Sequence, residues 1–301
     1  MTAPITYLSH KQIDKSRWDE GIQRAPNGLV YATSAYLDAM APGWDALVQG
    51  DYDHLFPLPW RRKWGVRYLF QPLLTAQLGL FGGDLTEARF NSFLQSIPRK
   101  FRYLDISLNH RNGFTGSVFP LSTRTNYVLD LGRPYEEILA TYRQNAKRNI
   151  RKAQQLGCTE AADLPVASVT KLASLHIPDE AGLARFTELY GKLREMSKAM
   201  TYGILDGKGQ LLASCVFLFS HGRAYYILVG NHPNGRTLGA SHLLLDAFIR
   251  AHAGTELLLD FEGSDLRNLA FFYSSFGART EYYPALRLNR LPWWCRWMKT
   301  A

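Results

Sequence analysis

The spacing of hydrophobic and polar positions predicts a regular series of helices and strands in the second half of the chain. Apolar residues at helical spacing predict a helix over 180–198. Three β-branched and aromatic runs, separated by the turn sequences DGKG and SHG, predict strands near 201–205, 211–219 and 223–230. A helix to about residue 252, a strand LLLDF, a helix DLRNLAFFYSSFG and a strand TEYYPALRLN complete an α/β pattern.

The first half repeats this order less clearly. Strands are expected within GWDALVQG, DHLFPLPWR and LLTAQLGLF, then a helix over 85–97 and strands in FRYLDISLN and TNYVLDL. At an offset of 155 residues the matches are Phe93 with Phe248, Leu104 and Asp105 with Leu259 and Asp260, Arg124 and Thr125 with Arg279 and Thr280, and Tyr127 with Tyr282. A helix, a strand and a final strand recur in one order, which indicates an internal duplication. We expect an α/β fold of two similar lobes in tandem, residues 1–157 and 158–301.

Residues 142–157, YRQNAKRNIRKAQQLG, carry five bases and no acid. Pro134 at a first helical position, acids in the first turn and Gly157 as a stop predict one amphipathic helix over 134–157. The face opposite its apolar flank holds Arg143, Lys147, Arg148, Arg151 and Lys152. Two interpretations stay open, a solvated outer face and a surface that meets phosphates.

Charge and cysteine usage narrow the classes of partner. The chain has 35 Lys and Arg against 26 Asp and Glu, a net charge of +9, which favours anionic partners. Its three cysteines are far apart and no Cys or His stands at metal-site spacing, so we expect neither a disulfide framework nor a metal site. The sequence shows no signal-peptide pattern. It also has no uninterrupted apolar run close to the ~18 residues that a membrane-spanning helix needs. We therefore expect a cytoplasmic protein.

Two segments of the second half are candidates for chemistry. The loop NGRTLGAS, residues 234–241, follows a strand and opens a helix, where backbone N–H groups bind phosphate oxygens. Arg236 adds a charge and Gly239 permits close approach; the alternative is a plain turn in which Ser241 caps the helix. LLLDFEGSD places Glu262 at the exit of a buried strand, as a base or a solvated acid, while Asp260 is interpreted as structural. Tyr273 is either a core aromatic or a proton donor.

Two further features remain weaker. His232 and His242 flank the glycine loop and are single-residue candidates for binding phosphate or transferring protons. No Ser stands in a G-x-S-x-G elbow. The tail NRLPWWCRWMKTA mixes Trp293, Trp294 and Trp297 with Arg290, Arg296 and Lys299. Such a tail either seats the protein on a membrane surface or packs against its own domain.

The chain resembles tandem GNAT-fold acyltransferases of the kind related to the FemAB aminoacyl transferases. Three segments carry this resemblance: the basic stretch, RTLGAS and LLLDFEGSDLRNLAFFYSSFGART. The resemblance implies an acyl or aminoacyl transfer to a primary amine, without a tightly bound cofactor, from acyl-coenzyme A or aminoacyl-tRNA. It places the donor's phosphates at Arg236, Gly239, Ala240 and Ser241. It also implies that the basic helix with Arg143, Lys147, Arg148 and Arg151 borders the acceptor cleft.

In this interpretation Glu262 is the base and Tyr273 the acid. The alternative is a non-catalytic module in which the same basic face binds RNA or an anionic membrane surface.

Overall fold

The chain divides into two compact units. The structure, a computed structural model, describes residues 3–263 and 265–292 of the 301. Unit 1 runs to Arg124 and resumes at Tyr282, and unit 2 is Thr125–Glu281. The division therefore differs from the predicted boundary between residues 157 and 158, and the basic stretch belongs to unit 2. The tail residues Trp293, Trp294, Arg296, Trp297 and Lys299 lie outside the described residues.

The strands of unit 1 come from both ends of the chain and belong to two sheets. One sheet has the order β1-β2-β3-β6, the strands of the second have the order β4-β5-β7-β14, and Leu78 forms an isolated parallel bridge with Leu108. The strands are β1 (Ile5–Leu8), β2 (Asp45–Gln49), β3 (His54–Leu58), β4 (Trp60–Lys63), β5 (Val66–Leu69), β6 (Phe81–Gly82), β7 (Phe101–Ser107) and β14 (Arg279–Asn289). The helices are α1 (Lys15–Arg24), α2 (Ser34–Met40) and α3 (Glu87–Ser96).

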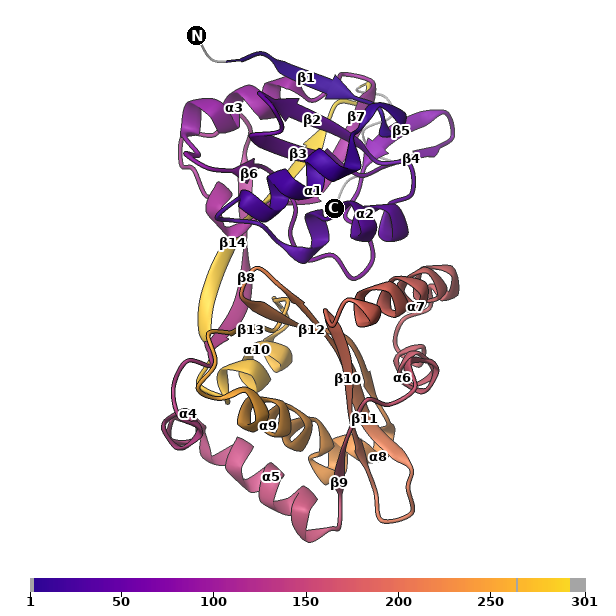
Figure 1. Ribbon diagram of the computed structural model, residues 1–301, viewed down its shortest axis with the longest axis vertical. Helices are drawn as coiled ribbons and strands as arrows, with labels where there is room; N and C mark the ends of the chain where they lie inside the picture. The colour runs from indigo at the N-terminus through magenta and orange to yellow at the C-terminus, as the bar shows by residue number, and fades with distance from the viewer. Residues whose placement is uncertain (1–2, 264, 293–301) are drawn as a thin grey trace. The chain divides into compact units, whose positions relative to one another are not determined.

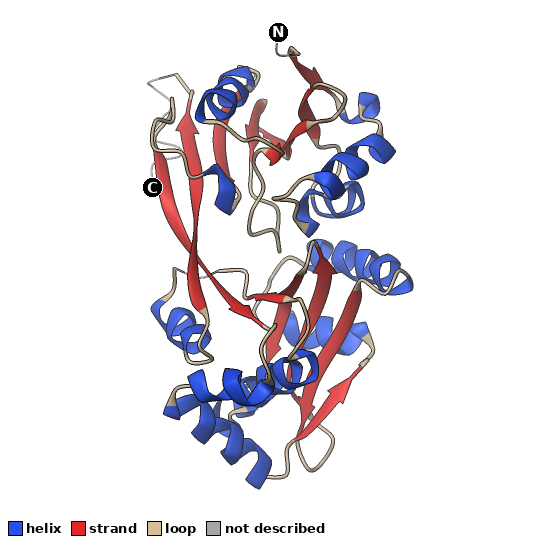
Figure 2. Ribbon diagram, turned by 60° about the vertical axis from the view of Figure 1, so that its left-hand side comes forward, coloured by secondary structure: helices blue, strands red, loops and turns tan. Residues whose placement is uncertain are grey.

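Unit 2 contains a mixed sheet with the order β8-β13-β12-β11-β10-β9. In Figure 1, α6 and α7 cover one side of its central strands and α5 and α9 the other, and Figure 2 shows the same layers. The strands are β8 (Leu121–Asp130), β9 (Thr159–Ala162), β10 (Ala199–Leu205), β11 (Leu211–Ser220), β12 (Arg223–Asn231) and β13 (Leu258–Asp260). The helices are α4 (Tyr135–Thr141), α5 (Gln144–Gln155), α6 (Val166–Ala173), α7 (Glu180–Glu195), α8 (Pro233–Leu238), α9 (Ala240–His252) and α10 (Arg267–Ser274).

The predicted α/β fold with two similar lobes is confirmed. At the offset of 155 residues, α3 overlaps α9, β7 overlaps β13 and β8 overlaps β14. The aligned residues Phe93 and Phe248 are each fully buried in the core of their own unit, as are Leu104 and Leu259. The matched Phe and Leu residues are therefore core positions, whereas Tyr282 of another matched pair is exposed.

An exchange of final strands explains why the two compact units do not follow the predicted boundary. β8 closes the first half of the sequence, yet its residues 128–130 pair with β13 of unit 2. β14 closes the second half, yet its residues 285–289 pair with β7 of unit 1. Each half of the sequence thus supplies the last strand of the other unit's sheet, and a single cut in the chain cannot separate the units.

The predicted helix over 134–157 is two helices, α4 and α5. Tyr142 and Arg143 between them are extended, with ψ of 137° and 156°. The Arg143 N–H donates to the Ser275 carbonyl at 2.8 Å, so the chain leaves the helical path to reach the end of α10. Because this partner is distant in sequence, helical periodicity alone does not reveal the break.

Candidate functional site

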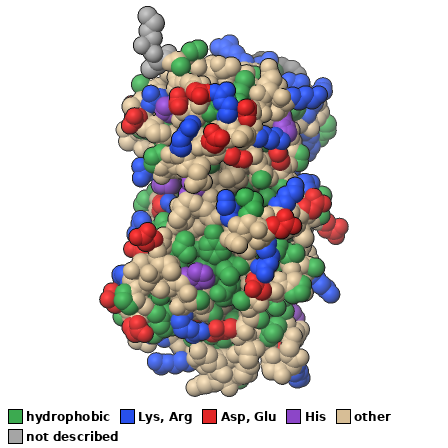
Figure 3. Space-filling model, viewed as in Figure 1, with side chains coloured by type: hydrophobic (Ala, Val, Ile, Leu, Met, Phe, Trp, Pro, Cys, Tyr) green, Lys and Arg blue, Asp and Glu red, His purple; other side chains and the backbone are tan. Residues whose placement is uncertain are grey.

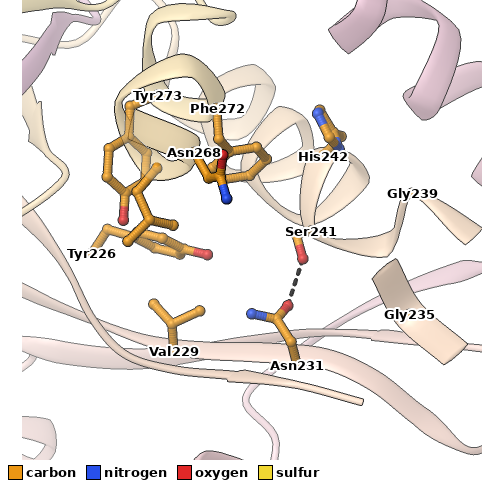
Figure 4. Close-up of a pocket in the computed structure, with 11 residues that line it drawn as sticks. Tyr226, Val229, Asn231, Gly235, Gly239, Ser241, His242, Asn268, Phe272 and Tyr273 are labelled. Atoms are coloured by element: carbon orange, nitrogen blue, oxygen red, sulfur yellow. Dashed lines mark hydrogen bonds between the residues drawn. The ribbon is translucent and has the colours of Figure 1, made fainter. Parts of the chain in front are cut away.

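A pocket opens where two parallel strands of unit 2 part. β12 pairs with β13 only over Arg223–Tyr225, because β13 ends at Asp260, while β12 continues to Asn231. A cavity of about 400 Å³ lies beside the unpaired part of β12 (Figure 4). Its walls come from β12, the α8–α9 junction and α10. The carboxyl end of a strand where a sheet divides is a common place for a ligand.

The predicted glycine loop is a junction of two helices, α8 and α9. Gly239 ends α8 and begins α9 in the left-handed conformation, with φ of +79°, which glycine adopts without a side-chain clash. A Cβ on Gly239 would lie 2.5 Å from the Asn149 carbonyl oxygen of α5, and one on Gly235 would lie 2.4 Å from that of Leu212. Both glycines therefore allow close backbone packing beside the pocket.

The N-terminus of α9 meets the pocket at Gly239 and Ser241. The first N–H groups of a helix have no acceptor within that helix, and they carry its positive dipole end. Ser241 does not cap the helix, so that interpretation was wrong; its hydroxyl donates to Asn231 Oδ1 instead. Ala240 is buried beside it, and the side chain of Arg236 lies outside what the structure describes. The backbone of this junction is suited to hold an oxyanion.

Two tyrosine hydroxyls border the other end of the pocket (Figure 4). Tyr273 of α10 is 6% exposed and stacks on Phe261 at 4.8 Å. Burial, with the negative charge of Glu262, raises the pKa of Tyr273 above its ordinary value. Burial likewise raises the pKa of Tyr226 on β12, a residue that sequence reasoning missed. Both hydroxyls are therefore protonated near neutral pH and are able to donate a proton or a hydrogen bond.

Glu262 and Asp260 follow β13 and play different parts. Glu262 is not among the residues that line the pocket, although it lies near enough to Tyr273 to raise its pKa. Its backbone has a φ of +61°, and its N–H donates to Asp260 Oδ1 at 2.9 Å. Asp260 is buried and pairs with Arg223 at 2.8 Å, which supports the structural interpretation of that carboxylate. Arg223 also pairs with Glu281 at 2.9 Å.

His242 lines the pocket as a neutral imidazole. Burial lowers the pKa of His242 to about 4. Its ring packs edge-on against Phe272 at 4.7 Å, and its Nε2 lies 3.5 Å from Asn149 Nδ2. His232 instead caps α8, because its ring accepts the Asn234 N–H at 3.2 Å. Of the two histidines that flank the junction, only His242 reaches the pocket.

The bases of the predicted basic helix separate onto different faces of α5. Lys147 and Arg151 line a second cavity of about 280 Å³ and do not line the first. Arg143 lies at the start of α5, with its guanidinium 5.4 Å from the Phe271 ring centroid, and Arg148 is exposed. Lys152 Nζ donates to the Thr237 carbonyl at 2.8 Å, beside the α8–α9 junction. The bases of the stretch therefore have different surroundings, and Lys147 and Arg151 share one cavity.

Helix α10 and its N-cap carry exposed apolar side chains. Hydrophobic residues gather on the face of unit 2 that Figure 3 shows. Leu266, Leu269 and Phe271 are exposed to solvent, and Leu269 also lines the pocket. Solvent-exposed apolar residues beside a pocket are typical of a surface that receives the organic part of a ligand.

Among the described residues, no group of three His, Cys, Asp or Glu side chains is arranged to hold a metal ion. Nor does any helix in the described ranges have both the length and the apolar character needed to cross a membrane. Arg290, the described cation of the C-terminal tail, donates from Nη1 to the Ile97 carbonyl at 3.2 Å.

Comparison with known proteins identifies the fold. Residues 140–267 match the family model of the acetyltransferase (GNAT) domain. The crystal structure of FemX is similar, with a TM-score of 0.63, 13% identity, and coverage of 90% of this chain and 96% of FemX. The tandem GNAT protein from the clavulanic acid biosynthesis pathway is similar, with a TM-score of 0.51, 11% identity, and coverage of 96% and 99%.

A third similar structure is the C-terminal domain of a putative lysylphosphatidylglycerol synthetase from Agrobacterium fabrum. Its TM-score is 0.54 at 9% identity, with coverage of 93% of this chain and 92% of that domain. No curated protein sequence matches the chain. At these identities the structural likeness concerns the fold, and it shows two GNAT-like lobes in tandem, as the sequence predicts.

Proposed function

Because the chain carries an acetyltransferase (GNAT) domain within a FemAB-like tandem GNAT fold, we propose that it transfers an acyl group from acyl-coenzyme A to a primary amine. One observation carries this proposal: the pocket between β12 and β13 ends at the N-terminus of α9. An acyl thioester with a pyrophosphate needs such an arrangement, a largely apolar pocket with an anion-binding group at one end.

The donor's pyrophosphate lies at the α8–α9 junction in this proposal. Backbone N–H groups of Ala240 and Ser241 and the dipole of α9 hold its oxygens, and Gly239 leaves the backbone accessible. Arg236 belongs to α8 and adds a positive charge to the sequence of this junction. The pantetheine arm follows the unpaired part of β12, past Val229, with apolar contacts from Leu269 and Phe272.

The acyl carbon lies near the two tyrosines. The amine lone pair attacks the thioester carbon, a C–N bond forms, the C–S bond breaks, and the sulfur leaves as a thiolate. Tyr273 donates its proton to that thiolate, since its hydroxyl is protonated and borders the pocket. Glu262, close to Tyr273, accepts the proton that the attacking amine loses, through one water, because its side chain does not line the pocket. N–H groups of β12 stabilise the oxyanion.

Titration calorimetry tests the donor. Acetyl-coenzyme A, charged bulk tRNA and uncharged tRNA are titrated separately at low and moderate salt. We expect saturable binding of acetyl-coenzyme A that is lost in Val229→Phe, which fills the pocket, and is retained in Val118→Phe, which adds the same bulk at an exposed position of unit 1. If only charged tRNA binds, the donor is aminoacyl-tRNA and the proposal of acyl-coenzyme A as the donor is refuted.

A second candidate is a non-catalytic module for RNA or an anionic membrane surface. The exposed cations Arg148 and Arg151 of α5 favour it. That module predicts an affinity for uncharged RNA or anionic vesicles that falls steeply with salt and does not change in Val229→Phe. Because the two candidates differ in this variant, one set of titrations separates them.

A further inference from the structure

A second cavity lies on unit 2 between α4, α5 and α9, apart from the donor pocket. Its volume is about 280 Å³, and it shares no lining residue with that pocket. Leu139 of α4 and Ile150 of α5 form an apolar wall. Lys147 and Arg151, one turn apart on α5, and Arg250 on α9 supply three cations around it. A cavity with one apolar wall and convergent cations is typical of a site for a small organic anion.

Three positively charged side chains line this cavity, and Asp246 is the one acidic side chain among the lining residues that the structure describes. In the part of the chain that the structure describes, the side chains of Lys147 and Arg151 have no hydrogen bond or ion pair. Arg250 pairs with Glu160 at 2.6 Å and lies 3.6 Å from Asp246 Oδ2. Asp246 is buried, and its Oδ1 accepts the Tyr135 hydroxyl at 2.9 Å. Two free cations therefore face the cavity beside a carboxylate that is already occupied.

We propose that this cavity binds a small oxyanion, a phosphate or carboxylate group on a small molecule, between Lys147 and Arg151 of α5 and Arg250 of α9. The guanidinium groups offer paired N–H donors that match the geometry of either head group. The wall of Leu139 and Ile150 holds the organic part of the ligand.

A ligand in this cavity would contact both α5 and α9, and α5 also packs against the α8–α9 junction. On its other face, the Asn149 carbonyl lies against Gly239, and Lys152 donates to the Thr237 carbonyl. An oxyanion that bridges Lys147, Arg151 and Arg250 therefore stabilises the helix against which the α8–α9 junction packs. The site acts as an effector site, distinct from the donor pocket, and it does not depend on the proposed reaction.

Titration calorimetry with inorganic phosphate, in a phosphate-free buffer, tests the site on the full-length protein. We expect the double variant Lys147→Gln with Arg151→Gln to lose at least tenfold in phosphate affinity. The double variant Arg148→Gln with Lys152→Gln removes the same charge from two residues of α5 that do not line the cavity, and we expect a loss of less than threefold. A parallel titration with acetate identifies the head group, since the tighter anion is the one that the cavity selects.

Three results would overturn the inference: no phosphate or acetate binding by the unaltered protein, equal losses in the two double variants, or the reverse order of losses. Hydrogen exchange provides the second readout. Phosphate should slow amide exchange in residues 147–155 of the unaltered protein and leave it unchanged in Lys147→Gln with Arg151→Gln. Unchanged exchange in the unaltered protein would refute the connection through α5. Neither measurement contains coenzyme A, so failure of the acyltransferase proposal would leave their outcome intact.

Discussion

Gly239→Ala tests whether the α8–α9 junction requires glycine for conformation alone or also for its contact with α5. Gly239 has a φ of +79°, and its added Cβ would lie 2.5 Å from the Asn149 carbonyl oxygen. Gly157 is a matched control in the same unit, because its φ is +73° and nothing lies within 4 Å of its added Cβ. The two substitutions share the conformational cost and differ in the collision.

The expected magnitudes follow from these two contributions. A left-handed alanine costs about 1–2 kcal/mol, partly offset by about 0.4–1 kcal/mol from the restricted unfolded chain. Gly157→Ala should therefore lower the free energy of unfolding by about 1 kcal/mol. For Gly239→Ala, overpacking against the backbone adds about 1–3 kcal/mol. A larger side chain, such as Trp, would disrupt the junction itself and is unsuitable as a simple block of the pocket.

Denaturant unfolding of the two variants, followed by circular dichroism, measures both free energies, and calorimetry with acetyl-coenzyme A measures the donor affinity. We expect Gly239→Ala to lose stability and donor affinity together, because α5 and the start of α9 must move apart. Equal free energies for the two variants would refute the collision. Normal donor affinity in a destabilised Gly239→Ala would remove the junction from the donor site.

Three further changes test the chemistry and the buried charges. Tyr273→Phe removes the proposed proton donor and should lower kcat by about 10²- to 10⁴-fold with little change in KM. An unchanged kcat would show that Tyr273 only packs against its neighbours. Because burial lowers the pKa of His242 to about 4, the unfolded chain takes up a proton below pH 6.5 and the folded chain does not until about pH 4. The neutral imidazole therefore contributes about 3 kcal/mol to the free energy of unfolding above pH 6.5, and this contribution is lost toward pH 4. His242→Gln should make the free energy of unfolding depend less on pH between pH 6.5 and pH 4. An unchanged pH dependence in this variant would contradict the prediction. Asp260→Ala leaves Arg223 with Glu281 as its acidic partner and should cost about 3–5 kcal/mol of unfolding free energy. Asp105→Ala, at the aligned and only partly buried position, should cost less than about 1 kcal/mol in the same assay.

Hydrophobic periodicity predicted the elements that bury one face against their own unit. The predictions near α7, β10, β11, β12 and β14 agree with the structure because their apolar residues alternate or recur at helical spacing. Helices α1, α2 and α6 were missed. LLTAQLGLF was expected to be a strand, yet only Phe81 joins one, with Leu78 in a single bridge.

The candidate site shows the same limit. Gly239 was identifiable because a glycine between a strand and a helix signals a special backbone conformation, and the structure gives it a φ of +79°. Tyr226 was not identifiable, since it is one aromatic among several in a buried strand. It borders the pocket because β13 stops at Asp260 and leaves that part of β12 unpaired. Tyr226 therefore owes its position to the length of another strand, which its own sequence surroundings do not encode.

The exchange of β8 and β14 is a further consequence of pairing that the duplication does not specify. β8 is the last element of the repeat in the first half of the sequence, and β14 is the last element of the repeat in the second half. The offset alignment therefore assigns each strand to its own half. Pairing decides otherwise, because residues 128–130 bond to β13 and residues 285–289 bond to β7. Leu129 is buried in the core of unit 2, and Leu286 is buried in that of unit 1. Since each core includes a residue from the other half of the sequence, neither half contains a complete hydrophobic core, and the site on unit 2 depends on a strand encoded before residue 131.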